Sequence, residues 1–199
     1  MKRFIVCLLI SVVLSASLLA GPFGVELGWS VGDLARNGIR YEDHKDDHYV
    51  AFEPPFAYYY MPNYYADYDQ DGIYCVSCFT NTIQTQKDGT ELWTYYKGIQ
   101  EDFNALYGLP YMIVDYYASD ALRNQPQNFT LGLVNGAIKI LTVWFIDMYV
   151  IMMDIYAYSE TEGDICCEVW EYSKIASYLG DLKNEYTVIY PQTKADIPW

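Results

Sequence analysis

Residues 138–172 contain three consecutive apolar stretches: IKILTVWFI at 138–146, MYVIMMDIYAYS at 148–159 and ICCEVWEY at 165–172. All three are rich in the β-branched and aromatic residues that favour strands, and each has the length of a strand. The polar segment SETEGD at 159–164 is typical of a hairpin loop. We therefore predict three consecutive antiparallel strands, with the rest of the chain covering or extending their sheet.

An earlier part of the chain predicts a second group of strands. YVAFE at 49–53 alternates, part of residues 56–67 can pair with it, and residues 73–83 are again strand-like. Pro54-Pro55 and the turn sequence DQDG at 69–72 separate the three segments. This pattern predicts a β-meander.

The clearest helix is predicted between Thr90 and Gly108, because apolar residues recur at spacings of three and four. These apolar residues are Leu92, Tyr96, Ile99, Phe103 and Leu106. Gly108 and Pro110 are typical of a helix ending. Shorter helices are predicted at residues 31–36, 126–134 and 173–184.

Together these elements predict an α+β fold of antiparallel β-meanders, with amphipathic helices packed on one face. The order of elements also allows a diverged duplication of an αβββ unit. Because no stretch has the composition of a disordered linker, we predict a single domain over residues 21–199.

The first twenty residues have the layout of a secretory signal peptide, with Lys2 and Arg3 before an apolar run at 4–14 and small residues after it. We expect cleavage after Ala20, with Ser17 as the alternative. No later apolar run reaches the length of a membrane span without charges. The sequence therefore predicts an exported protein, periplasmic or extracellular, without a transmembrane segment after cleavage.

The chain is strongly acidic, with a formal net charge of −14. Cleavage would remove Lys2 and Arg3 but no acid, leaving 10 basic and 26 acidic residues and a net charge of −16. Such a protein repels phosphate backbones and anionic membrane surfaces. We therefore expect no nucleic-acid partner, and expect either a protein partner or a neutral or cationic ligand.

Three short segments resemble a group of small uncharacterised bacterial exported proteins. They are GPFGVELGWS at 21–30, DGTEL at 88–92 and YGLP at 107–110. The group usually has Met where Trp29 stands here and an acid where Gly32 stands. The resemblance implies export and an α+β fold with a closing β-meander, and it implies no activity and no functional residue.

The densest aromatic stretch, FEPPFAYYYMPNYY at 52–65, is the candidate ligand or partner surface. The alternative is a proline-interrupted edge strand whose rings pack alternately on the core and the surface. The candidate residues are Phe56, Tyr58, Tyr59, Tyr60, Tyr64 and Tyr65.

Four cysteines follow the signal segment: Cys75, Cys78, Cys166 and Cys167. On strands, residues one or three apart point to opposite faces, so at most one cysteine of each pair meets the other pair on a given face. One cross-strand disulfide in an oxidising compartment, buried free thiols and a metal site all remain open.

His44 and His48, with Asp47 between them, form a weak metal-binding pattern. Lys45 stands where the HExxH motif needs its glutamate, so a solvated loop is the alternative. The sequence lacks GxSxG, P-loop and dinucleotide-binding motifs. We therefore predict no cofactor and a non-enzymatic exported binding or interaction protein, an envelope accessory or inhibitor-like module. The alternatives are a small exported hydrolase using paired carboxylates and a weak metal-binding protein.

Overall fold

The computed structural model describes residues 22–193. The predicted signal peptide, residues 1–20, lies outside this range, as do residues 194–199. The described part of the chain divides into two compact units, residues 22–77 and 78–193, and the single domain predicted from the sequence stays a prediction. Both units combine helices with antiparallel strands, so the fold is mixed α and β, but the predicted αβββ duplication is not confirmed.

The first unit is built around a small antiparallel sheet with the strand order β1-β2-β3-β4. Tyr41 pairs with Phe52 across β1 and β2, and Tyr49 pairs with Asp67 across β2 and β3. The elements of this unit are η1 (Pro22–Gly24), α2 (Val31–Arg36), β1 (Tyr41–His44), η2 (Lys45–Asp47), β2 (Tyr49–Phe52), β3 (Asn63–Asp69) and β4 (Gly72–Phe79), the last of which continues into the second unit.

Helix α2 has the predicted bounds and the predicted start. Ser30 precedes it, and the Asp33 carboxylate accepts hydrogen bonds from the Ser30 backbone N–H at 2.8 Å and from its Oγ at 2.6 Å. Strand β1 was not predicted. Its residues are polar and at least partly exposed, so the apolar alternation that reveals a half-buried strand is missing there.

The second unit contains the three strands of residues 138–172 in a larger antiparallel sheet. Its strand order is β9-β8-β7-β6-β10, with the short β5 also paired to β9. Its strands are β5 (Ile83–Gln84), β6 (Met112–Tyr117), β7 (Ile138–Ile146), β8 (Tyr149–Ala157), β9 (Glu162–Glu171) and β10 (Val188–Ile189). Its helices are α3 (Thr90–Tyr107), α4 (Asp120–Arg123), η3 (Pro126–Asn128), α5 (Phe129–Val134) and α6 (Tyr172–Glu185).

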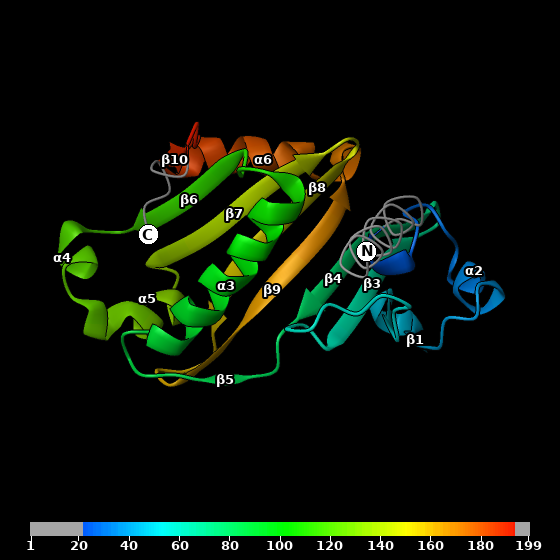
Figure 1. Ribbon diagram of the computed structural model, residues 1–199, viewed down its shortest axis with the longest axis horizontal. Helices are drawn as coiled ribbons and strands as arrows, with labels where there is room; N and C mark the ends of the chain where they lie inside the picture. Colours follow the sequence, from blue (N-terminus) through cyan, green and yellow to red (C-terminus); the bar gives the residue numbers. More distant parts are fainter. Residues whose placement is uncertain (1–21, 194–199) are drawn as a thin grey trace, which may run out of the picture. The chain divides into compact units, whose positions relative to one another are not determined.

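Helices cover both faces of this sheet, which corrects the prediction that they pack on one face. On one face, Tyr96 and Gln100 of α3 hydrogen-bond to Thr142 at 2.6 and 3.2 Å. On the other, Leu179 of α6 packs in a cluster with Leu141, the neighbour of Thr142 on β7. Figure 1 shows α3 in front of the strands and α6 behind them.

The physical reason lies in the composition of β7 and β8. Both strands are buried almost without interruption, so apolar side chains project from both faces and each face needs a cover. Burial on this scale is the main favourable term in folding, at about 25 cal/mol per Å² of apolar surface. Within the described residues, no helix has the length and apolar character needed to cross a membrane.

Candidate functional site

Four of the six predicted aromatic residues lie in the loop of residues 53–62, between β2 and β3 in the first unit, and the other two, Tyr64 and Tyr65, lie on β3. At the tip of the loop the Met61 N–H donates to the Tyr58 carbonyl at 3.0 Å, closing a tight turn with Tyr59 and Tyr60 at its centre. The Tyr58 N–H donates to the Tyr64 hydroxyl at 2.6 Å, and Met61 is fully buried. We call residues 58–61 the aromatic turn. The hydrogen bond from Tyr58 to Tyr64 and the buried Met61 side chain anchor this turn to the core.

The six predicted residues divide between surface and core. Tyr59 is 89% exposed, Phe56 42% and Tyr60 37%, while Tyr58 and Tyr65 are half-buried. The prediction was wrong for Tyr64, which is 3% exposed and packs against Phe52. Its position explains this, because Tyr64 and Tyr65 are successive residues of β3 and therefore point to opposite faces.

The two histidines lie near each other in the chain but contact different aromatic rings. His44 ends β1 and stacks on Tyr49, with ring centroids 4.5 Å apart, whereas His48 lies edge-on to Tyr68 at 6.2 Å. Asp47 belongs to the intervening turn η2. Over residues 22–193, no three His, Cys, Asp or Glu side chains are arranged to hold a metal ion.

All four described cysteines are buried and carry free thiols. Cys78 and Cys167, both in the second unit, lie within hydrogen-bonding distance of each other. Burial, together with this contact, raises the pKa of the Cys167 thiol well above its ordinary value. Burial also raises the pKa of Cys166. Thiols with a raised pKa are poor nucleophiles, which argues against Cys166 and Cys167 as reactive groups.

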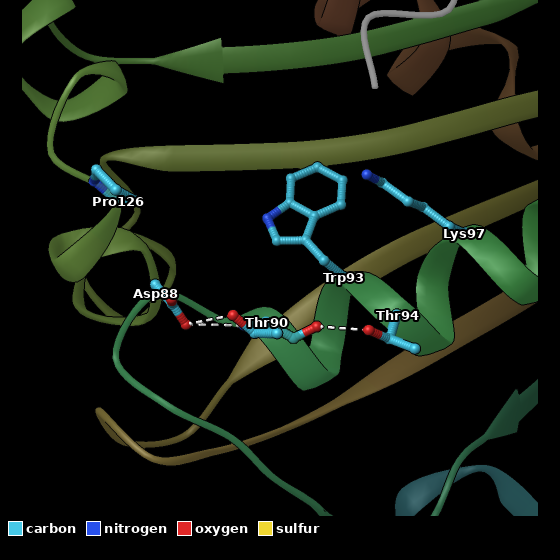
Figure 2. A pocket seen from close by; sticks show the side chains of 6 residues that line it. All are labelled: Asp88, Thr90, Trp93, Thr94, Lys97 and Pro126. Atoms are coloured by element: carbon cyan, nitrogen blue, oxygen red, sulfur yellow. Dashed lines mark hydrogen bonds between the residues drawn. The ribbon is translucent and has the colours of Figure 1, made fainter.

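A surface pocket that the sequence did not reveal lies at the start of α3 in the second unit (Figure 2). Its volume is about 420 Å³. Three segments of the chain contribute to it: the loop before α3, the first two turns of α3, and η3. The lining residues are Asp88, Thr90, Trp93, Thr94, Lys97 and Pro126.

Trp93 is the largest side chain of the pocket, and Figure 2 shows its indole between Lys97 and Pro126. The ring is supported from below by the buried Phe129, at a centroid distance of 5.2 Å. The Lys97 Nζ lies 5.6 Å from the centroid of the indole, a favourable cation–π distance. The pocket therefore has a supported aromatic ring beside a positive charge.

The polar rim of the pocket is fixed by hydrogen bonds. Asp88 Oδ1 accepts from the Thr90 N–H at 3.0 Å and from the Thr90 Oγ1 at 2.7 Å, and Thr94 Oγ1 donates to the Thr90 carbonyl at 2.8 Å. Asp88 thus stabilises the first turn of α3, where a negative charge is favourable. The rim offers hydroxyls, a carboxylate and an ammonium group around the indole.

Two buried aspartates, Asp154 and Asp164, lie among the strands of the second unit, on the sheet face that α6 covers. Asp154 is 7% exposed and its Oδ2 forms an ion pair with Lys139. Asp164 is 6% exposed and its Oδ2 accepts a hydrogen bond from the Tyr158 hydroxyl. The Oδ1 atom of each aspartate is buried and has no hydrogen-bond partner within the described chain.

Burial with incomplete pairing shifts the pKa values of Asp154, Lys139 and Asp164. Burial raises the pKa of Asp154 to about 6, and the attraction of Lys139 offsets only part of the rise. Burial alone would lower the pKa of Lys139, but the Asp154 carboxylate outweighs it, so the pKa of Lys139 is raised. Burial likewise raises the pKa of Asp164.

Comparison of the chain with protein-family models, curated proteins and solved structures finds no match.

Proposed function

We propose that the protein is an exported, non-enzymatic binding protein that contacts a protein partner through the aromatic turn. One observation carries this proposal: Tyr59 is 89% exposed at the tip of a turn whose backbone is anchored to the core. Isolated exposed rings are common on protein surfaces. Here Phe56, Tyr59 and Tyr60 are exposed together within one short loop.

The anchoring of the turn favours binding. Tyrosine is enriched at binding hot spots because it offers a large contact area and a hydroxyl with few rotatable bonds. Tyr59 and Tyr60 meet edge to face, with centroids 5.2 Å apart, so each ring limits the motion of the other. Because backbone and rings are already ordered, little conformational entropy remains to be lost when a partner binds.

The charge of the chain narrows the class of partner. A net charge of −14, or −16 after the proposed cleavage, favours a neutral or basic partner surface and disfavours nucleic acid and anionic membranes. Export itself can be tested on the intact protein. Its mass, measured from the periplasm or the medium, should correspond to a chain that begins at Gly21, and an uncleaved chain in the cytoplasm would contradict export.

Paired-carboxylate hydrolysis receives less support. Asp154 and Asp164 are the buried carboxylates with raised pKa values, but Lys139 holds one and the Tyr158 hydroxyl holds the other. Their remaining oxygens are buried, and a general acid or base must reach the substrate.

The proposal is tested by affinity capture with the mature protein from the envelope and medium of the organism that produces it. The test variant carries Tyr59→Ser and Tyr60→Ser together. The matched control is Tyr172→Ser, a tyrosine that is 49% exposed but lies outside the turn. We expect a partner, identified by mass spectrometry, that the wild type and the control retain and the double variant loses. The affinity of the purified partner should then fall by about tenfold or more in the double variant.

Equal capture by all three proteins would contradict the proposed surface. The absence of any specific partner in repeated captures would contradict the proposed function.

A further inference from the structure

We propose that the pocket at the start of α3 binds a pyranose ring of a neutral saccharide. This site is separate from the aromatic turn, because every residue that lines it belongs to the second unit. The inference therefore goes beyond the proposed partner surface and does not depend on it.

The size of the pocket suits a small ligand. Its volume of about 420 Å³ falls in the range of about 300–1,000 Å³ that is usual for small-molecule sites.

The lining matches the two chemistries of a pyranose. One face of such a ring carries axial C–H groups, which pack against an indole, and its edge carries hydroxyls that both donate and accept hydrogen bonds. Trp93 supplies the apolar platform. Lys97 supplies a donor and Asp88 an acceptor at the rim.

Both charged rim groups keep capacity for a ligand. Asp88 Oδ1 is occupied by Thr90, whereas its Oδ2 forms no hydrogen bond within residues 22–193. Lys97 forms no ion pair within the same residues, and its ammonium lies over the indole, 5.6 Å from the ring centroid. Because the Lys97 side chain is exposed, it can move aside for a stacked ring. A sugar on the indole would then have the Lys97 donor on one side and the Asp88 acceptor on the other (Figure 2).

Other ligand classes fit less well. An anion would approach Asp88 in a chain of net charge −14, and a cation would approach Lys97. A purely aromatic ligand would stack on Trp93 but would desolvate both charged groups without replacing their hydrogen bonds. A neutral ring bearing hydroxyls avoids all three penalties.

The test uses chitohexaose, cellohexaose and maltohexaose as probes at millimolar concentration. Binding is followed by saturation-transfer difference NMR and by the change in tryptophan fluorescence. We expect at least one probe to bind, and its affinity to fall by about tenfold or more in Trp93→Ala, because the stacking contact is lost. Tyr95→Ala is the matched control, since Tyr95 is exposed on the same helix but does not line the pocket.

Trp93→Ala removes a contact with Phe129 and could disturb the fold, so a second variant is needed. Thr94→Tyr fills the pocket from an exposed position and removes no buried packing; it loses only the exposed hydrogen bond from Thr94 Oγ1 to the Thr90 carbonyl. We expect it to abolish binding while the circular dichroism spectrum and melting temperature stay those of the wild type. The Tyr59→Ser, Tyr60→Ser double variant should bind the sugar normally, which separates this inference from the proposed partner surface.

Failure of all three oligosaccharides to bind the wild type would overturn the inference. So would undiminished binding by Thr94→Tyr.

Discussion

The aromatic turn and the α3 pocket are built in opposite ways. All residues of the turn come from one loop of ten residues, whereas the pocket is assembled from segments around residues 88, 97 and 126. The turn projects side chains outward from a short anchor. The pocket holds one ring, that of Trp93, against the buried Phe129 of α5. A surface made by one loop can be recognised in the sequence, but a surface made by converging segments can be recognised only in the fold.

Both sites contain a glycine with positive φ at which an added Cβ would overlap a neighbouring side chain. Gly24 has φ +83°, and a Cβ there would lie 2.3 Å from Pro55, in the loop of residues 53–62 that carries the aromatic turn. Gly89 has φ +70°, and a Cβ there would lie 2.3 Å from Phe129, the ring that supports Trp93. The difference is that Pro55 is exposed and can move, while Phe129 is buried and cannot.

The largest effect is therefore expected for Gly89→Ala. A non-glycine residue at this φ costs about 1–2 kcal/mol, and overpacking against Phe129 adds about 1–3 kcal/mol. We expect the free energy of unfolding in urea to fall by about 2–5 kcal/mol. The control is Gly98→Ala in the same helix, where a Cβ meets nothing within 4 Å and helix propensity predicts a gain of up to about 1 kcal/mol. If the free energies of unfolding of the two variants were similar, Phe129 would be able to move aside for the added methyl group.

The buried Asp154 makes the stability of the second unit depend on pH. Its pKa is about 6 in the folded chain and 3.8 as an ordinary carboxyl, so the folded state favours the protonated form. The stability contributed by this group is present below about pH 4 and is lost as pH rises to about 6. The loss amounts to about 3 kcal/mol at most, at 1.36 kcal/mol per pKa unit.

Urea unfolding of the wild type and Asp154→Asn at pH 4, 5, 6 and 7 measures this effect. The asparagine carbonyl still accepts a hydrogen bond from Lys139 but does not titrate. We expect the wild type to lose stability relative to the variant between pH 4 and pH 6, with no further change above. Parallel pH profiles would show that the Asp154 carboxylate is well solvated.

Gly24→Ala should have a smaller effect than Gly89→Ala, about 1–3 kcal/mol, because the loop carrying Pro55 can shift. Gly28→Ala is the control, since its φ of +92° is equally unfavourable to alanine but a Cβ there meets nothing within 4 Å. The difference in stability between the two variants, measured by thermal unfolding, isolates the contact with Pro55. If Gly24→Ala cost as much as Gly89→Ala, the two supports would be equally rigid.

The smallest effect is expected for Tyr59→Ser. At 89% exposure the ring contributes little to folding, so the free energy of unfolding should change by less than about 0.5 kcal/mol. Chemical denaturation of the two proteins side by side measures this. A large loss would mean that Tyr59 stabilises the fold, and the capture experiment would then need a different variant.

Local patterns in the sequence predicted individual elements well. The helix expected between Thr90 and Gly108 is α3, and the strand expected at 138–146 is β7 with the same bounds. Both elements are long: α3 shows apolar residues at helical spacing, and β7 is a nearly continuous run of apolar and β-branched residues. The short strands β1 and β10, of four and two residues, were missed, because backbone pairing at a sheet edge needs no particular side chains.

The candidate sites show the same limit. Phe56, Tyr59 and Tyr60 were identified because aromatic residues are dense in their loop, and the error at Tyr64 arose because density ignores which face a residue takes. Trp93 had one usable signal: it is a large aromatic residue beside, and not within, the apolar stripe of α3. Nothing in the sequence indicated that η3 would lie next to it, because that contact spans about thirty residues.

The pairing of β10 with β6 also bears on how the second unit folds. Ile189 pairs with Ile113, 76 residues apart in the chain, so β6 gains this neighbour only when two distant segments meet. Strand β9 likewise pairs with the distant β5. Because closing a long loop costs entropy before the new contacts compensate for it, pairing between distant strands slows folding. We therefore expect the edges of this sheet to form late in folding, after the hairpin of β7 and β8.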